Sequence, residues 1–346
     1  MSYSSLSPLT GPNPTPDPDD ENAVKNDYSA AIGALILSLV FLLGVPGNLF
    51  IVWSILARCQ QRSVTTLLIL NLACADGFLM ALTIFFIIYL VMQTWVFGNA
   101  MCKILFYLCN SNMYASIFLI TLMSVHRLLA IVFPHTLYHL ITRKVVRRVI
   151  LGTWVLVMVM SIPSLVFRDV KKETDDMNQT TYVFQYAFET VAGFIIPYAI
   201  IITCYVVILK RLRETKFQRN SHSEKLILAI VITFGLFWLP YHVINMVQVV
   251  QALGRDPLPH QLDAISQSSR AVTSALAFIS SCANPVLYTF AGKSYIKKNG
   301  FAFMAKLFEG TLSDQTGTKN VFQHPVSICI SNSPLNSVPS MGCVEG

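Results

Sequence analysis

The stretch Ser-Ser-Cys-Ala-Asn-Pro-Val-Leu-Tyr at residues 280–288 lies deep inside the last long apolar run of the chain, residues 271–290. Pro285 removes a backbone hydrogen-bond donor and weakens a helix, and Asn284 carries a polar group that hydrocarbon cannot solvate. Polar residues in such a segment usually face the interior of a helix bundle and mark a functional site. The stretch therefore predicts a membrane-embedded helix with a functional inner face.

The composition of the whole chain agrees with this prediction. Of its 346 residues, 54% are hydrophobic and 12% are charged, and the mean hydropathy is +0.56, whereas soluble domains carry roughly 25% charged residues. We therefore expect an all-α membrane protein, a seven-transmembrane helix bundle, because seven apolar segments reach the roughly 20 residues needed to cross a bilayer. The segments are residues 29–56, 64–92, 100–132, 146–167, 186–212, 224–252 and 264–290.

The basic residues predict the orientation of these spans. The net charge is +7, and most of the 25 Lys and Arg residues lie in alternate connections, such as residues 58–62, 143–148 and 210–225. Cytoplasmic loops carry such an excess, so we expect a multi-pass plasma-membrane protein with its N-terminus outside the cell. Because these charges flank membrane spans, they do not indicate a nucleic-acid partner.

The segments outside the bundle have compositions of their own. Residues 1–28 are polar and rich in Pro and Asp, which predicts a disordered extracellular tail before the membrane domain at residues 29–292. Residues 293–309 mix basic and apolar residues at helical spacing, which predicts an amphipathic helix on the inner leaflet or a plain linker. Residues 310–346 predict a disordered, phosphorylatable cytoplasmic tail. Asn178 begins a glycosylation sequon in the predicted loop before span five.

Asp76 lies near the middle of the second span, where a charge is costly unless it is paired or hydrated. We expect Ser116 in span three and Ser281 and Asn284 in span seven to accompany it. Such an oxygen-rich cluster suits a sodium ion or bound water. The alternative is a protonated Asp76 that only holds helices together. We expect no other cofactor.

Several features, taken in order along the chain, resemble the rhodopsin-like (class A) G-protein-coupled receptors over residues 29–308. They include Arg127 at the end of span three, Pro197 in span five and Trp238 in span six, together with Asn-Pro-x-x-Tyr in span seven. The segments Leu-Pro-Tyr-His at residues 239–242 and Phe-Glu-Gly at residues 308–310 resemble leukotriene B4 receptors in particular. The resemblance implies a receptor, not an enzyme.

The resemblance also implies an eicosanoid ligand with a long apolar chain, hydroxyls and one carboxylate. Two Arg residues could hold the carboxylate, three polar residues could meet the hydroxyls, and aromatic residues could wall the chain. The candidates for the carboxylate are Arg168 and Arg270. The candidates for the hydroxyls are Glu189, Asn245 and Tyr114, and those for the apolar chain are Phe106 and Trp238. Phe106 replaces a His or Tyr of those receptors. Each residue also has an interpretation without a ligand. Arg168 could extend its charge to the membrane interface, and Arg270 and Glu189 could pair with each other. Asn245 and Tyr114 could form contacts between helices.

The activation switch that the resemblance implies comprises Arg127, Tyr205, Trp238, Pro240, Asn284, Pro285 and Tyr288. His126 stands where the family usually carries an acidic residue beside Arg127. We therefore expect raised basal activity, or a substitute partner such as Glu224. Residues 169–186 contain no Cys, so the disulfide that the family normally forms at Cys102 is expected to be absent.

The expected partners are a leukotriene B4-like lipid, a heterotrimeric G protein of the inhibitory type, arrestin and receptor kinases at the tail, and membrane lipids. A peptide chemoattractant receptor remains an alternative, because the acidic residues near Asp19 could attract a basic peptide. A transporter is a remote alternative, since no internal repeat is evident.

Overall fold

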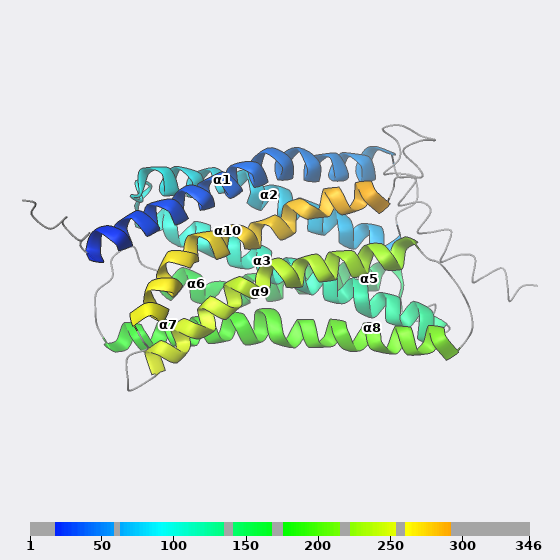
Figure 1. Cartoon of the computed structure of the whole chain (residues 1–346). Coiled ribbons are helices and arrows are strands. Elements are labelled where there is room, and N and C mark those ends of the chain that lie inside the picture. Colours follow the sequence, from blue (N-terminus) through cyan, green and yellow to red (C-terminus); the bar gives the residue numbers. More distant parts are fainter. Residues whose placement is uncertain are drawn as a thin grey trace, which may run out of the picture.

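The computed structural model describes residues 18–58, 63–134, 141–167, 176–214, 222–253 and 260–291, and within these ranges it is helical without strands (Figure 1). Long helices lie side by side and cross the bundle from end to end. They are α1 (Pro18–Trp53), ending in the π-turn η1 (Ser54–Arg58), α2 (Val64–Met92), α3 (Gly98–Val132), α5 (Arg143–Met160), α6 (Ile162–Phe167), α7 (Asp176–Thr190), the π-helix η2 (Val191–Ile195), α8 (Ile196–Glu214), α9 (His222–Leu253) and α10 (His260–Ala291).

Helix α3 is the central element of the bundle, since it contacts α2, α5, α6, α8 and α9. Ile117, Ile120 and Met123 of this helix belong to the main buried cluster, where no more than 2% of each is exposed. The outward faces carry large apolar side chains such as Leu151 and Leu236, 66% and 64% exposed. Helices that are apolar on all sides are suited to a lipid environment, so the all-α membrane fold is confirmed.

Among the residues that the structure describes, six helical segments are long and apolar enough to cross a membrane. The seventh lies within α10, where the apolar helical part among the described side chains is Val272–Leu287. The predicted amphipathic helix at 293–309 and the tail at 310–346 lie outside the described residues.

Helix α1 begins at Pro18, ten residues earlier than the predicted end of the N-terminal tail. Proline is favoured in the first turn of a helix, where its missing N–H has no partner to lose. Asp19, Asp20 and Glu21 follow directly, and acidic side chains stabilise the positive end of the helix dipole. Because the residues around Pro18 have low hydropathy, the sequence interpretation did not identify the start of this helix.

Spans four and five also differ from uninterrupted helices. A turn at Ser161 separates α5 from α6, because Pro163 cannot donate a backbone hydrogen bond. Helix α7 starts at Asp176, so the sequon at Asn178 lies within this helix and not in a loop, and the apolar segment of span five begins at Val183 rather than at residue 186. The π-helix η2 interrupts the span just before Pro197, and short π segments often occur at functional sites.

Candidate functional site

The carboxylate of Asp76 lies at the centre of a fully buried polar cluster. Its Oδ2 accepts a hydrogen bond from Asn284 Nδ2 at 2.8 Å, and its Oδ1 accepts hydrogen bonds from Ser116 Oγ and Asn112 Nδ2, both at 3.3 Å. The side chain of Ser281 also hydrogen-bonds to this carboxylate. The structure thus brings together the four residues considered for an ion or water site, and it adds Asn112.

Two amide oxygens belonging to Asn112 and Asn48 are buried and have no hydrogen-bond partner within the described residues. Asn48 Nδ2 donates to the backbone oxygens of Gly44 at 3.0 Å and Ser281 at 3.3 Å, which ties span one to span seven. An unpaired buried acceptor costs about 1–3 kcal/mol, and a hard cation or a water molecule would satisfy it. One carboxylate among neutral oxygens is a donor set compatible with either a small monovalent cation or a bound water molecule.

Glu189, near the end of α7, is the centre of a second buried network and is only 2% exposed. Its Oε1 accepts hydrogen bonds from Asn110 Nδ2 at 2.7 Å and from Gln185 Nε2 at 2.8 Å. Its Oε2 accepts a hydrogen bond from the Tyr241 hydroxyl at 3.2 Å. Asn110 also donates to the Ser164 hydroxyl. Residues from α3, α7 and α9 therefore donate to one buried carboxylate, and α6 joins the network through Ser164.

Two further polar atoms beside this network are buried and unpaired among the described residues. They are Oε1 of Gln185, an acceptor, and Nδ2 of Asn245, a donor, and each of these side chains is 1% exposed. Asn245 lies one helical turn beyond Tyr241 on α9. A hydroxyl group both donates and accepts hydrogen bonds, so an unpaired donor and an unpaired acceptor are complementary to hydroxylated ligands.

Aromatic residues surround these polar groups. Tyr114 is 1% exposed and packs on Phe188, with 6.5 Å between ring centroids. It fits against η2 only because residue 193 is glycine: a Cβ there would lie 2.7 Å from Cε1 of Tyr114. Phe106, one turn before Asn110 on α3, meets Phe86 edge-on at 5.9 Å. Both residues therefore pack against aromatic neighbours within the bundle.

Trp238 lies between the Asp76 cluster and the Glu189 network. Its indole Nε1 donates to Ser280 Oγ at 2.9 Å, and Ser280 is the sequence neighbour of Ser281 in the Asp76 cluster. Its ring meets that of Tyr241, the hydrogen-bond donor to Glu189, edge-on at 5.6 Å. Phe234 stacks on the other part of the ring at 5.6 Å. The side chains of Tyr241, Trp238 and Ser280 therefore form a continuous series of contacts from Glu189 to the residue next to Ser281 of the Asp76 cluster.

At the opposite end of α3, His126 and Arg127 are 6% and 5% exposed. His126 Nδ1 has no hydrogen-bond partner in the described part of the chain. Tyr205 of α8 packs against the main core cluster. Arg168 lies outside the described residues, and for four other candidates the structure describes the backbone but not the side chain; these are Asn178, Glu224, Arg270 and Tyr288.

The partners that the sequence interpretation missed share one signal. Asn110, Asn112, Gln185 and Tyr241 each precede a predicted site residue by four positions, namely Tyr114, Ser116, Glu189 and Asn245. Residues four apart lie on the same face of a helix. Extending each candidate by one turn would have placed all four on the same helix faces as the candidates, without identifying which residue each of them contacts.

The fold and its two interior polar sets define a multi-pass helical membrane protein that is organised around buried binding groups. The family model of the 7 transmembrane receptor (rhodopsin family) matches residues 47–288. The chain belongs to this family of receptors, and it is therefore a receptor rather than an enzyme.

Individual relatives cover most of the chain. Leukotriene B4 receptor 1 of Homo sapiens is 39% identical over 302 residues, which are 85% of this chain and 86% of that receptor. Leukotriene B4 receptor 2 of Rattus norvegicus is 35% identical over 313 residues, 88% of this chain and 87% of that receptor. The C3a anaphylatoxin chemotactic receptor of Danio rerio is 30% identical over 308 residues, 86% and 82% of the two chains.

Proposed function

We propose that this protein is a G-protein-coupled receptor for leukotriene B4 or a related hydroxy-eicosanoid and that it acts in chemoattractant signalling. The network around Glu189 carries the proposal, because Gln185 Oε1 and Asn245 Nδ2 are buried beside it without partners in the described residues. Two such atoms cost free energy until a ligand pairs them. The similarity to leukotriene B4 receptors 1 and 2 supports the same ligand class.

The ligand carboxylate would bind to Arg168 and Arg270. A guanidinium keeps its charge in a dry pocket and can hold a carboxylate through two parallel hydrogen bonds. Labelled leukotriene B4 should lose affinity for membranes that carry Arg168→Ala or Arg270→Ala. Unchanged affinity in both variants would rule out the anchoring role.

Signal transfer would start at Tyr241 and Trp238. A ligand that competes for the hydrogen bond between Tyr241 and Glu189, or that pushes on the Trp238 ring, changes contacts that lead to Ser280 and the Asp76 cluster. Pro240 and Pro285 interrupt the hydrogen-bond ladders of α9 and α10, so each helix has a weak point at which to bend. Ligand binding would then favour a bundle with an open inner end, stabilised by Arg127, Tyr205 and Tyr288.

The open inner end would receive the C-terminal helix of a heterotrimeric G protein of the inhibitory type, as a helix docks in a groove. Receptor kinases and arrestin would act on the tail at residues 310–346. The N-terminus would face the outside of the cell. The Asp76 cluster would hold a sodium ion, whose ligands would be Asp76, Ser116 and the unpaired oxygen of Asn112.

Nucleotide exchange on purified G-protein heterotrimers tests the central proposal. Leukotriene B4 and a panel of hydroxylated and non-hydroxylated fatty acids would be added to the full-length protein in lipid nanodiscs. We expect exchange with the hydroxylated eicosanoids, strongest on the inhibitory subtype. The absence of exchange on every subtype would reject the function.

A peptide ligand is the second candidate, because a chemotactic receptor for an anaphylatoxin is 30% identical over 86% of this chain. Basic peptides and leukotriene B4 would be compared in the same exchange assay and in competition. Activation by a peptide alone would favour this second function over the lipid receptor.

A further inference from the structure

The side chain of Tyr198 in α8 reaches the backbone of α9. Its hydroxyl donates a hydrogen bond of 3.3 Å to the backbone carbonyl of Val231. In an α-helix this carbonyl also accepts a hydrogen bond from the N–H four residues later, here that of Gly235. A carbonyl oxygen has two lone pairs, so the Tyr198 hydroxyl occupies the second one. A side chain of span five is therefore bonded directly to the main chain of span six.

Gly235 makes this contact possible. A Cβ at this buried position would overlap the Tyr198 hydroxyl, and it would lie 2.6 Å from the ring carbon Cζ. Glycine is the least favourable residue inside a helix after proline, so its presence in the middle of α9 needs a local reason. The space that the Tyr198 ring requires supplies that reason, and Gly235 forms a notch in α9 that admits the ring.

The notch lies in the inner half of span six, which is packed onto the bundle in this structure. Ile227, Ile230 and Val231 of this half belong to the main core cluster and are no more than 2% exposed. Arg127, at the inner end of α3, is also buried. The inner end of the described bundle is therefore closed, and the hydrogen bond from Tyr198 belongs to the closed arrangement.

A bend at Pro240 would break this hydrogen bond early. Along α9, Pro240 lies about 8 Å from Gly235 and about 27 Å from His222, the first residue of the helix. If α9 bends at Pro240 so that His222 moves about 4 Å away from α8, Gly235 moves by about 1 Å. A hydrogen bond of 3.3 Å is lost when its atoms separate by that amount. The contact therefore distinguishes the closed bundle from one that has opened only slightly.

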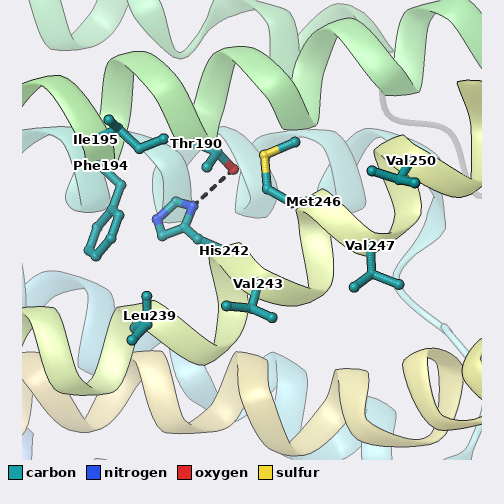
Figure 2. Close-up of a pocket in the computed structure, with 9 residues that line it drawn as sticks. All are labelled: Thr190, Phe194, Ile195, Leu239, His242, Val243, Met246, Val247 and Val250. Atoms are coloured by element: carbon teal, nitrogen blue, oxygen red, sulfur yellow. Dashed lines mark hydrogen bonds between the residues drawn. The ribbon is translucent and has the colours of Figure 1, made fainter.

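A second contact joins spans five and six on the outer side of Pro240. An apolar groove of about 440 Å³ lies between η2 and α9 at this level (Figure 2), so individual side chains rather than continuous packing connect the two spans. His242 Nδ1 and Thr190 Oγ1 form a hydrogen bond of 3.2 Å, drawn as a dashed line in Figure 2. This bond lies on the opposite side of Pro240 from Gly235, so it can persist while the inner half of α9 moves.

A series of rings connects the notch to the Glu189 network. Tyr198 stacks on Phe194 with 5.3 Å between centroids, and Phe194 stacks on His242 at 4.6 Å. The His242 ring meets that of Tyr241 edge-on at 5.3 Å, and the Tyr241 hydroxyl donates to Glu189. These contacts are continuous from the Glu189 carboxylate to the Tyr198 ring, so a change at the ligand end can alter the position of Tyr198.

We propose that Tyr198 and Gly235 form a latch that holds the inner half of span six against span five, and that ligand binding releases this latch through the ring series. Tyr198 is a positioning residue, since it acts through the backbone of α9. The inference rests on the proposed function for the ligand that releases the latch and for the G protein that binds the open state. The latch itself belongs to the helix bundle and can be measured without either.

The test compares the full-length protein in lipid nanodiscs with three variants. Tyr198→Phe keeps the ring and removes the hydroxyl, and Gly235→Ala fills the notch. Tyr107→Phe is the matched control, because the Tyr107 hydroxyl also donates to a backbone carbonyl of a neighbouring span, that of Met158 at 3.2 Å. That bond joins spans three and four, so its loss should not release span six.

The distance between the inner ends of spans five and six is the measurement. Spin labels are attached to clickable residues that replace Leu209 of α8 and Leu228 of α9, which are 51% and 38% exposed. Pulsed electron paramagnetic resonance then gives the ratio of open to closed molecules without ligand or G protein. Thermal unfolding midpoints are recorded in parallel.

We expect the ratio of open to closed molecules to rise about three- to tenfold in Tyr198→Phe, the usual effect of losing one neutral hydrogen bond. Gly235→Ala should raise it at least as much, and adding Tyr198→Phe to Gly235→Ala should change nothing further. Tyr107→Phe should keep the wild-type ratio. A lower unfolding midpoint with an unchanged ratio in Tyr198→Phe would show a purely structural role and overturn the proposal, as would an equal rise in Tyr107→Phe.

Nucleotide exchange separates this inference from the proposed function. A raised ratio in Tyr198→Phe without exchange by leukotriene B4 on any G-protein subtype would reject the receptor function and retain the latch. Exchange by leukotriene B4 in the wild type with an unchanged ratio in Tyr198→Phe would reject the latch alone.

Discussion

Gly47 of α1 lies directly against the ring of Pro285 in α10. A Cβ built on Gly47 would stand 2.9 Å from both Cβ and Cγ of Pro285, which is too close for any contact between carbon atoms. Both groups belong to helix backbones that cannot move apart independently. The close approach of the first and last spans at Pro285 therefore depends on the absence of a side chain at residue 47.

Gly47→Ala should destabilise the protein by about 1–3 kcal/mol, the usual cost of overpacking a well-packed interior. The midpoint of thermal unfolding in nanodiscs measures the effect. Gly152→Ala is the control, since a Cβ at Gly152 meets no atom within 4 Å. Equal midpoints for the two variants would show that span one and span seven are not closely packed in the membrane.

Glu189→Gln should weaken leukotriene B4 binding by about tenfold or more. The amide of Gln places an N–H donor against Asn110, Gln185 or Tyr241, which already donate to this position. Binding of labelled ligand to membranes, corrected for receptor amount, gives the affinity. Ile202→Ala serves as the control, because Ile202 is 49% exposed on the lipid-facing side of α8. Full affinity in Glu189→Gln would exclude the network from the ligand site.

Sodium should stabilise the wild-type protein and not the Asp76→Asn variant. A ligand that binds only the folded state at ten times its Kd adds about 1.4 kcal/mol. The unfolding midpoint would be compared in sodium chloride and in N-methylglucamine chloride at equal ionic strength. An equal sodium effect in both proteins would place the ion elsewhere, and no effect in either would favour bound water.

His126→Asp should lower basal nucleotide exchange by about tenfold. A carboxylate beside the buried Arg127 guanidinium adds a charge-assisted hydrogen bond worth about 1.5–3 kcal/mol to the inactive state. His126→Asn has the same shape as the Asp variant but no charge, and it should not lower the basal rate. If His126→Asp retains the wild-type rate of basal nucleotide exchange, the absence of an acidic residue at position 126 does not determine that rate.

Hydropathy and single polar residues were enough to predict the bundle and the core of the Asp76 cluster. A polar residue in hydrocarbon must have polar neighbours, so Asp76, Ser116 and Asn284 could be grouped without coordinates. The same reasoning applied to residues 1–28 missed the start of α1 at Pro18, because a helix turn composed of polar residues has no hydropathy signal.

The identity of the hydrogen-bond donors could not be predicted in this way. That Glu189 accepts from Asn110, Gln185 and Tyr241 depends on how α3, α7 and α9 are rotated about their axes, and hydropathy does not determine that rotation. The break at Ser161 and the π-helix at Val191–Ile195 also follow from local backbone geometry. They became evident only with the arrangement of the helices.

The π-helix has a consequence for the alignment of span five. Its buried positions Glu189, Gly193, Pro197 and Ile201 follow each other at intervals of four residues. A regular α-helix turns by about 100° per residue, so each such step overshoots a full turn by about 40° and three steps overshoot by about 120°. The wider turn at η2 takes up part of this drift and keeps both halves of the span facing inward. Deletion of one residue within η2 would rotate the half that holds Glu189 away from the half that holds Tyr205, and the ligand end would lose its alignment with the G-protein end.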